Sequence, residues 1–317
     1  MNGNQIILGT RGSELALKQT SMVTALLQAA HPFLEVSHTV IQTTGDKRQD
    51  LKLNQFGKDG AALVDKGIFI KELEVALESK QIHAAVHSLK DLPSELEQHF
   101  AVAAVLERAP IEDVLISAGK YTLNTLPQGA TVGTSSVRRA RQLHLLRPDV
   151  KIVDLRGNVP TRVRKCLGEN ALDAIILAAA GLMRLDLLKP NSRTITIDDQ
   201  KLHAQILDPT KFLPAAGQGA IAIEVNAKDG YMRDVFAKIN HPETEARIKA
   251  EREFLRLLGA GCQTPVGAHS WIEGRKLHMT VRVFSEDSLL APPMEATAAF
   301  SIDSPLTLAR RLADRVR

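Results

Sequence analysis

A short pattern occurs twice along the chain and restricts its fold more than any other feature of the sequence. Residues 7–13 read ILGTRGS and residues 131–136 read TVGTSS, so each apolar run ends in Gly-Thr and leads through serine into a helical pattern. Serine is a favoured helix N-cap, and we expect Ser13 and Ser136 to begin helices directly after buried strands. The repeat predicts two similar α/β lobes that face each other, each with a mainly parallel sheet.

Other segments of the first lobe continue this alternation. The β-rich residues 36–43 and 82–89 predict strands, and the spacing of apolar residues over 69–79 predicts a helix between them. The polar, glycine-containing residues 44–67 are too long for an ordinary connection, and we interpret them as a mobile lid. The helix after Ser13 is predicted to carry on one face Leu15, Met22 and Leu26, with Val23 and Leu27 beside them.

The character of the sequence changes near residue 240, where a small α+β domain is predicted. A helix is expected to open at Pro242 and to end before Gly259, because glycine is favoured just past a helix end. Alternating apolar and polar residues over 277–283 predict an antiparallel strand, with residues 273–276 as the preceding hairpin turn.

Composition narrows the class of protein. Among 317 residues, 44% are apolar, which is enough for the cores of two or three domains. A net charge of +4 and only 4% aromatic side chains disfavour a nucleic-acid-binding surface. We expect neither a signal peptide nor a membrane span, since the longest apolar run, residues 174–183, is shorter than the roughly 20 residues that a span needs. Two cysteines make no disulfide framework, so a cytoplasmic protein is expected.

Arginines gather where the predicted strands end. Arg11 follows the first strand, and Arg138 and Arg139 follow the equivalent strand of the second lobe. Ligands of open α/β sheets bind outside the carboxyl ends of the strands, where helix N-termini add backbone donors. Any one arginine is equally compatible with a surface charge, but their recurrence predicts a site for several carboxylates or phosphates. The full set is Arg11, Arg138, Arg139, Arg156, Arg162 and Arg184.

Two shorter motifs carry other reactive side chains. AVHSLKDLP places Ser88, Lys90 and Asp91 at a strand end, where the aspartate either forms an inert ion pair or handles protons or a developing cation. GAGCQTPVGAH places Cys262 after a helix C-terminus, whose dipole does not activate a thiolate, so this cysteine is either a small buried residue or a thiol activated by nearby cations. Cys166 is expected to serve packing, and no metal is expected because the histidines lack metal-ligand spacing.

Seven segments together resemble the porphobilinogen deaminase (hydroxymethylbilane synthase) family in their order and separations. They are GTRGSELALKQ, KGIFIKELEVAL, AVHSLKDLP, VGTSSVRRARQL, LRGNVPTR, PAAGQGAIAIE and GAGCQTPVGAH, within about residues 5–285. The resemblance implies that Cys262 carries a dipyrromethane cofactor through a thioether, made from two units of the substrate porphobilinogen. It also implies that porphobilinogen loses ammonia, that four units are joined head to tail, and that hydrolysis releases hydroxymethylbilane for haem synthesis.

The same resemblance assigns roles to individual residues. Asp91 matches the catalytic aspartate, which contacts pyrrole N–H groups and stabilises cationic intermediates. Cofactor-binding roles fall on Cys262, Ser88, Lys90, Asp91, Thr134, Ser135, Ser136, Arg138, Arg139, Arg156, Gly157, Arg162 and Arg184. Substrate-binding roles fall on Arg11, Ser13, Lys66, Arg156, Arg162 and Arg184.

The resemblance further implies a monomer of three domains, the first two like the lobes of type II periplasmic binding proteins. Domain 1 is expected over residues 1–106 and 214–238, domain 2 over 107–213 and domain 3 over 239–317. Two departures from the family pattern stand out. Ala62 occupies a position that is often lysine, which leaves the lid and Lys66 open, and the chain ends within a helical pattern where members commonly continue.

Two other classes of protein fit parts of the sequence. A two-lobed binding protein without catalysis would use the Gly-Thr and Ser motifs, and a basic nucleic-acid binder would use RRARQLHLLR. The third domain with Cys262 argues against the first class, and the low aromatic content argues against the second. Release of ammonia from porphobilinogen distinguishes the enzyme from both.

Overall fold

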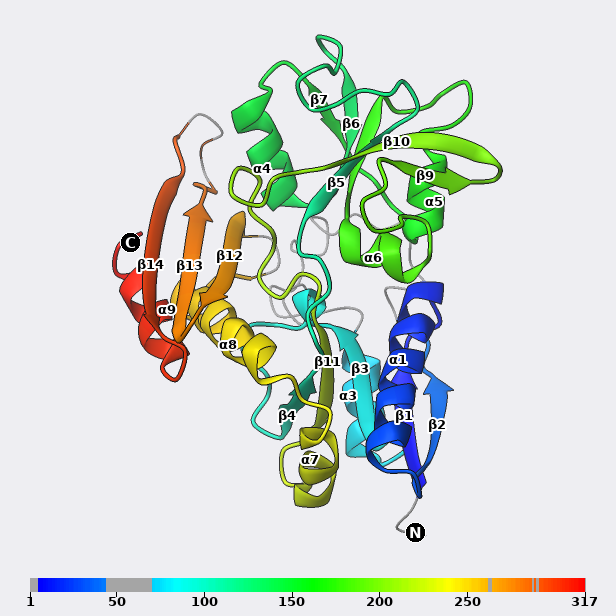
Figure 1. Ribbon diagram of the computed structural model, residues 1–317, viewed down its shortest axis with the longest axis vertical. Helices are drawn as coiled ribbons and strands as arrows, with labels where there is room; N and C mark the ends of the chain where they lie inside the picture. The colour runs from blue at the N-terminus through cyan, green and yellow to red at the C-terminus, as the bar shows by residue number, and fades with distance from the viewer. Residues whose placement is uncertain (1–4, 44–69, 262–263, 287, 289–290, 317) are drawn as a thin grey trace, which may run out of the picture.

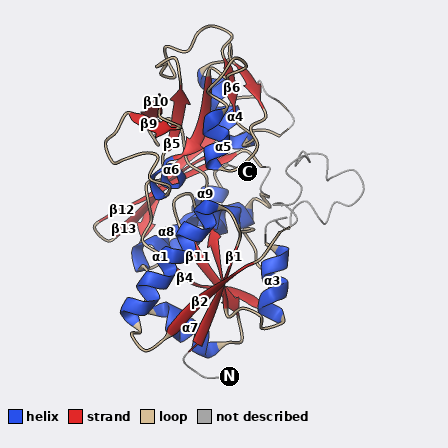
Figure 2. Cartoon of the chain, turned by 90° about the vertical axis from the view of Figure 1, so that its right-hand side faces the viewer, coloured by secondary structure: helices blue, strands red, loops and turns tan. Residues whose placement is uncertain are grey.

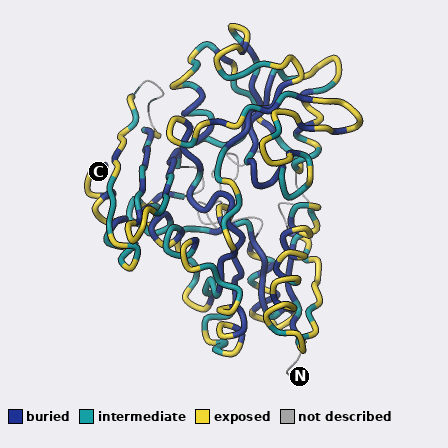
Figure 3. Tube along the Cα trace, viewed as in Figure 1, coloured by how far each residue is buried: buried dark blue, intermediate teal, exposed yellow. Residues whose placement is uncertain are grey.

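The chain folds around three β-sheets, each with its own helices (Figure 1). The computed structural model describes residues 5–43, 70–261, 264–286, 288 and 291–316. Buried residues follow the strands of each sheet (Figure 3), so each sheet forms the centre of its own core. Among the helices so described, none is long and apolar enough to cross a membrane.

The first lobe is a five-stranded sheet with helices on both faces. Its strand β1 runs parallel to both neighbours, whereas β11 runs antiparallel to β3 and β4. Figure 2 shows α1 on one side of the sheet and α3 on the other. The strand order is β2 (Glu35–Val40), β1 (Gln5–Thr10), β3 (Ala84–Ser88), β11 (Ile221–Asn226), β4 (Phe100–Val105). The helices are α1 (Glu14–Ala30), α3 (Lys71–Glu78) and α7 (Gly230–Ala237).

The second lobe repeats this plan. Its strand β6 is parallel to both neighbours and β5 is antiparallel to β8 and β10, so the first five strands have the same order and directions as the first sheet. The order is β7 (Lys151–Val153), β6 (Thr131–Gly133), β8 (Ala174–Ala178), β5 (Asp113–Ser117), β10 (Gln200–Ile206), β9 (Thr194–Ile197). The helices are α4 (Val137–Leu146), α5 (Val159–Arg164) and α6 (Ala179–Arg184).

The shared order confirms the prediction of two similar α/β lobes. The prediction of mainly parallel sheets is also confirmed, because four strands of each sheet run in one direction: β2, β1, β3 and β4 in the first, and β7, β6, β8 and β10 in the second. The antiparallel strands β11 and β5 each enter their sheet from a segment that arrives from the other lobe.

Two segments, 106–112 and 207–220, connect the lobes, and we call them the first and second crossovers. They lie side by side: Ala109 N donates to Gly219 O at 3.2 Å and Arg108 Nε donates to Gln218 O at 2.9 Å. Gly219 has φ of +86°, and a Cβ there would lie 2.4 Å from Ala109 O, so this approach requires glycine. β11 follows the second crossover and belongs to the first sheet, while the domain boundaries themselves stay a prediction.

The third sheet packs against two helices and matches the expected small α+β domain. Its strands are β12 (Val266–Glu273), β13 (Lys276–Val283) and β14 (Met294–Ser301), all antiparallel, and its helices are α8 (Pro242–Leu257) and α9 (Pro305–Ala313). Phe254, Leu277 and Leu308 meet in its core. Helix α8 opens at Pro242 as predicted, and Gly259 follows its end with φ of +62°. The hairpin turn lies at Gly274, as expected from residues 273–276.

Helix α1 begins at its predicted cap but turns a different face to the core. Ser13 Oγ accepts a hydrogen bond from Ala16 N at 3.3 Å. The buried positions are Ala16, Gln19, Thr20, Val23 and Leu27, so the apolar face predicted on Leu15, Met22 and Leu26 is wrong by one residue. Met22 and Leu26 are exposed.

This difference gives a paired test of the first lobe's core. Leu27 is 0% exposed and Leu26 is 44% exposed. Leu27→Ala should destabilise the first lobe by about 2–5 kcal/mol because it leaves a cavity. Leu26→Ala should change stability by less than about 0.5 kcal/mol. Urea unfolding followed by circular dichroism measures both, and equal midpoints for the two variants would contradict the assigned face.

Candidate active site

Polar and charged residues follow the carboxyl ends of parallel strands in both lobes, as predicted. A single 3₁₀ turn, Leu89–Asp91, follows β3 and presents Lys90 and Asp91. In the second lobe, Ser136 caps α4 by accepting a hydrogen bond from Arg139 N at 3.4 Å, and this helix start carries Arg138 and Arg139. The two lobes approach each other here, because α1 contacts α6 and Lys18 Nζ lies 3.5 Å from Asp186 Oδ2.

Charged residues from the two lobes interact in one cluster. Arg162 of the second lobe interacts electrostatically with Asp91 and Arg11 of the first lobe. Lys90 of the first lobe likewise interacts with Arg138 and Arg139. We call this set the interlobe cluster; it consists of Arg11, Lys90, Asp91, Arg138, Arg139, Arg156 and Arg162.

Asp113 at the start of β5 holds both adjacent arginines. Arg138 Nη1 donates to Asp113 Oδ2 at 2.8 Å, and Arg139 donates to Asp113 Oδ1 from Nε at 3.0 Å and from Nη2 at 2.7 Å. All three residues are buried. Burial alone would raise the pKa of Asp113, but the two guanidinium groups hold that pKa well below its usual range. Sequence reasoning missed Asp113, although an acidic residue directly before the apolar run VLIS was a visible anomaly.

Arg138 and Arg139 differ in which of their guanidinium nitrogens already have a hydrogen-bond partner. Arg139 directs Nε and Nη2, one side of its guanidinium, at Asp113, and its Nη1 at Ile176 O. Among the described residues, Arg138 finds partners only for Nη1, which donates to Asp113 and to Leu213 O. Within the described part of the chain, its Nε is buried and without a partner. A carboxylate binds guanidinium through such an Nε–Nη2 edge, so Arg138 fits a bidentate carboxylate partner.

Arg184, which contacts the second crossover, also has a buried Nε that no described residue accepts from. Its Nη2 donates to Gly219 O at 2.7 Å. Desolvation lowers the pKa of Arg184 to about 10. A buried, partly satisfied cation gains from an anionic partner, so Arg184 also fits a carboxylate.

Desolvation and neighbouring cations lower the pKa values of Lys90 and Arg162 as well. Desolvation is the main cause that lowers the pKa of Lys90 to about 8, with Arg139 lowering it further and Asp91 raising it. The Lys90 side chain is nevertheless exposed, so it is surrounded by protein atoms yet open to water, which weakens the lowering. Desolvation, followed by Arg139, lowers the pKa of Arg162 to about 10. Unlike these cations, Asp91 is exposed, and within the described chain nothing donates a hydrogen bond to its carboxylate.

The hydroxyl groups assigned to the site serve mainly to shape it. Ser135 Oγ donates to Leu155 O at 3.0 Å, and Thr134 Oγ1 accepts from Ser136 N at 3.2 Å. Ser88 Oγ accepts from Gln19 Nε2 at 2.8 Å.

Gly157 shapes the turn that carries two of the arginines. It has φ of +106°, and its carbonyl accepts from Arg162 Nε at 2.6 Å. A Cβ at this position would lie 2.8 Å from Thr161 Cγ2. The glycine therefore allows the turn that orients Arg162 and that directly follows Arg156.

Cys262 and Lys66 lie outside the described residues, as do Ala62 and the predicted lid over 44–67. The other cysteine behaves as predicted: Cys166 is buried, and desolvation raises the pKa of its thiol to about 12. Cys166 lies in the turn that follows α5, whose last residue is Arg164.

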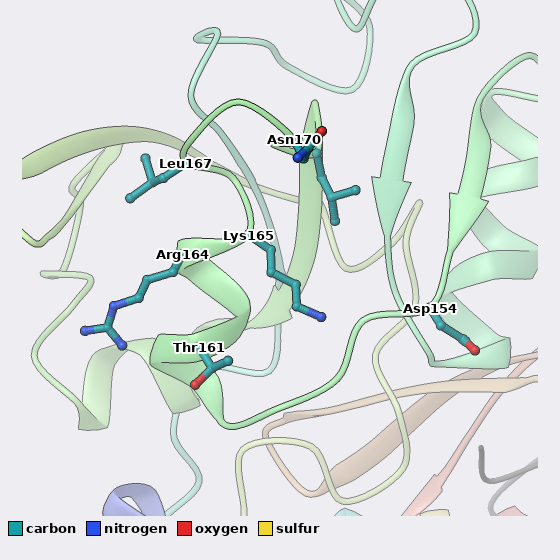
Figure 4. A pocket seen from close by; sticks show the side chains of 7 residues that line it. Asp154, Thr161, Arg164, Lys165, Leu167 and Asn170 are labelled. Carbon is teal, nitrogen blue, oxygen red and sulfur yellow. The ribbon is translucent and has the colours of Figure 1, made fainter. Parts of the chain in front are cut away.

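A separate pocket of about 460 Å³ opens in the second lobe (Figure 4). Thr161, Arg164 and Lys165 line it from α5 and its end, with Asp154 from the segment after β7. No residue of the interlobe cluster lines it, so it is not the predicted site. Its remaining lining residues are Leu167, Asn170 and Leu172.

Two α/β lobes with a cluster of cations between them, and a third domain attached, define a two-lobed protein whose interlobe face is suited to an anionic ligand. The model of the family "Porphobilinogen deaminase, dipyromethane cofactor binding domain" matches residues 6–234. The model "Porphobilinogen deaminase, C-terminal domain" matches residues 246–317. The chain belongs to the porphobilinogen deaminase family, a family of transferases in tetrapyrrole synthesis.

Curated relatives agree over most of the chain. The porphobilinogen deaminase of Chloroherpeton thalassium is 44% identical over 282 residues, which are 89% of this chain and 83% of that protein. That of Roseiflexus castenholzii is 42% identical over 313 residues, 99% of this chain and 96% of that protein. Among solved structures, an ancestral cationic amino acid solute-binding protein matches with a TM-score of 0.43 at 8% identity, over 79% of this chain and 94% of that one.

The lowered pKa of Lys90 predicts unusual reactivity. At pH 8 an amine of pKa about 8 is half neutral, whereas an ordinary lysine is almost wholly charged. Even with water weakening the effect, Lys90 should acylate at least about tenfold faster than an ordinary exposed lysine. Pulse acetylation between pH 7 and 9, read by peptide mass spectrometry with the exposed Lys276 as reference, measures this. Equal rates for the two lysines would contradict the assigned surroundings of Lys90.

Proposed function

We propose that this chain joins porphobilinogen units head to tail on a dipyrromethane primer attached to Cys262 and releases the linear tetrapyrrole hydroxymethylbilane. The observation that carries the proposal is the interlobe cluster, where cations from both lobes surround the exposed carboxylate of Asp91. Membership of the porphobilinogen deaminase family supports the same reaction.

The excess of positive charge suits this substrate. Each pyrrole brings an acetate and a propionate, so a growing chain accumulates carboxylates. Arg138 and Arg184 each have an Nε that no described residue satisfies, and a carboxylate would satisfy both atoms. We assign carboxylate binding to Arg11, Lys90, Arg138, Arg139, Arg156, Arg162 and Arg184, with Ser13, Ser88, Thr134, Ser135, Ser136 and Gly157 shaping the site.

Asp91 is the residue best placed to act on the reacting pyrroles. Its carboxylate is exposed beside Lys90 and free of hydrogen bonds from described residues, so it can accept from a pyrrole N–H and stabilise positive charge that develops there. Lys90, with a pKa of about 8, stays largely protonated at pH 7 and partly balances Asp91. A fixed carboxylate in a site otherwise rich in cations stabilises a cation selectively at one position.

When bound, the dipyrromethane would supply the pyrrole carbon to which the first unit is joined, and each later unit would be joined to the unit before it. The described residues on either side of the attachment point form a short turn: Gly261 N donates to Thr264 Oγ1 at 3.1 Å, and Thr264 N donates to Gly261 O at 3.1 Å. Gly261 lies a few residues after the end of α8 at Leu257, within the sequence of the third domain. Lys66 and residues 44–67 are assigned to a lid that excludes water during coupling.

We further propose that the chain acts as a cytoplasmic monomer without a metal ion or a nucleic acid partner. Arginine and lysine supply the charge neutralisation for which phosphate- and carboxylate-binding enzymes often use a metal. The domain boundaries proposed are 1–106 with 214–238, 107–213, and 239–317. They are supported by the position of β11 in the first sheet after the second crossover.

The mass of the intact protein tests the proposed function. The purified chain should exceed its polypeptide mass by two deaminated pyrrole units, and porphobilinogen should raise the mass in further steps of one unit. Cys262→Ser should remove the extra mass while the chain still folds. A bare polypeptide mass that neither porphobilinogen nor preformed hydroxymethylbilane changes would contradict the proposal.

Asp91→Asn should separate primer binding from turnover. The variant should carry the normal extra mass, because the arginines that bind carboxylates are unchanged. Its rate of ammonia release should fall on the order of 10²–10³-fold, since the fixed charge that stabilises the developing cation is lost. Asp234→Asn, on α7 at an exposed position of the first lobe, is the matched control. Turnover near that of the control would remove Asp91 from the reaction.

A further inference from the structure

The carboxylate of Asp113 is at the centre of a buried network that no assigned role explains. It is 0% exposed and accepts hydrogen bonds from three side chains. Two of these are Arg138 and Arg139, and the third is Gln218, whose Nε2 lies 3.0 Å from Asp113 Oδ1. Gln218 belongs to the second crossover and is itself 0% exposed.

We propose that Asp113 is a positioning residue for the reaction: it holds the guanidinium group of Arg138 so that the open Nε–Nη2 edge meets a carboxylate of the pyrrole chain. The inference rests on the proposed function, and it adds a residue that never touches substrate. Asp113 acts through Arg138 and Arg139, and Gln218 links all three to the crossovers.

The geometry around Arg138 supports this role. Its Nη1 is held from two directions, by Asp113 Oδ2 and by Leu213 O. Two fixed acceptors at one end of a planar guanidinium restrict its rotation, so the opposite edge has a defined direction. Without Asp113, the carbonyl of Leu213 alone would hold Nη1, and the edge would no longer be fixed.

Gln142 and Gln218 extend the network along the second crossover. Gln142 pins both backbone groups of Leu213, donating to its carbonyl at 2.9 Å and accepting from its N–H at 2.7 Å. Gln218 Nε2 also donates to Ile111 O of the first crossover at 2.6 Å. The position of the Arg138 edge therefore depends on both segments that connect the lobes.

A second interpretation makes the opposite prediction. Asp113 could stand in for a substrate carboxylate and leave the arginines when the primer binds. Complete burial and the additional hydrogen bond from Gln218 favour a permanent partner over a displaced one. Loading of the primer should thus become slower when Asp113 is altered, whereas a displaced partner would make it faster.

The test uses variants that keep charge or volume. Asp113→Glu keeps the negative charge but moves it by one methylene, and Gln218→Met keeps the volume but removes the donor to Asp113. Asp149→Asn is the matched control, because it removes the ion pair with Arg147 at the other end of α4. Each chain is prepared without primer, checked by its melting temperature, and given porphobilinogen or preformed hydroxymethylbilane.

Folded Asp113→Glu should load primer and turn over about tenfold to a hundredfold more slowly than the wild-type chain, with a higher KM for porphobilinogen. Gln218→Met should show a smaller loss in the same direction, and Asp149→Asn should load at the wild-type rate. If both folded variants load primer at the wild-type rate and keep the wild-type KM, or if either loads faster, the role of Asp113 is overturned. The proposed function would be unaffected by that result. A wild-type chain that never gains pyrrole units would overturn both the function and this inference.

Discussion

Three parts of the chain meet at one buried carboxylate, that of Glu251 on α8. Arg108 of the first crossover donates to it from both Nη atoms at 2.6 and 2.9 Å, and Gly217 N of the second crossover donates at 2.7 Å. Removing one partner of such a buried pair costs about 3–5 kcal/mol, because the other charge remains without water. The orientation of α8 relative to both crossovers therefore depends on this interaction.

The charges around Glu251 attract each other, whereas most charges of the interlobe cluster repel each other. Its cations lower one another's pKa values, as Arg139 does for Lys90 and for Arg162, so they repel each other before any ligand is present. Asp91 and Asp113 offset only part of that repulsion. A carboxylate-rich ligand removes the rest, and binding to the folded state alone stabilises that state. The same mutual repulsion would thus favour the binding of the polyanionic chain that we propose as ligand.

The features that the sequence predicts correctly are those that depend on residues close together along the chain. Ser13 and Ser136 cap their helices, Gly259 ends α8, and the hairpin turns at Gly274, since each depends on neighbouring residues. The face of α1 was misjudged because the core accepts Ala16, Gln19 and Thr20 there, while Met22 and Leu26 stay exposed. The antiparallel strands β5 and β11 depend on contacts between segments that are distant along the chain, and so do the partners Asp113, Gln218 and Glu251. The separation is 34 residues for Gly217 and Glu251 and 105 for Asp113 and Gln218, and the sequence has no periodic pattern for such contacts.

The family resemblance and the structure contribute different knowledge about the same arginines. By motif, Arg138 and Arg139 are adjacent and equivalent, and both are assigned to carboxylates of the cofactor. By geometry they differ, because Arg139 directs its Nε–Nη2 edge at Asp113 and Arg138 does not. A guanidinium has few edges on which a carboxylate can sit in the plane, so an edge bound by a protein carboxylate is closed to a ligand. Asp113 thus makes the two arginines unequal: in the proposed site Arg138 offers its Nε–Nη2 edge to a ligand carboxylate, whereas Arg139 contributes mainly its positive charge.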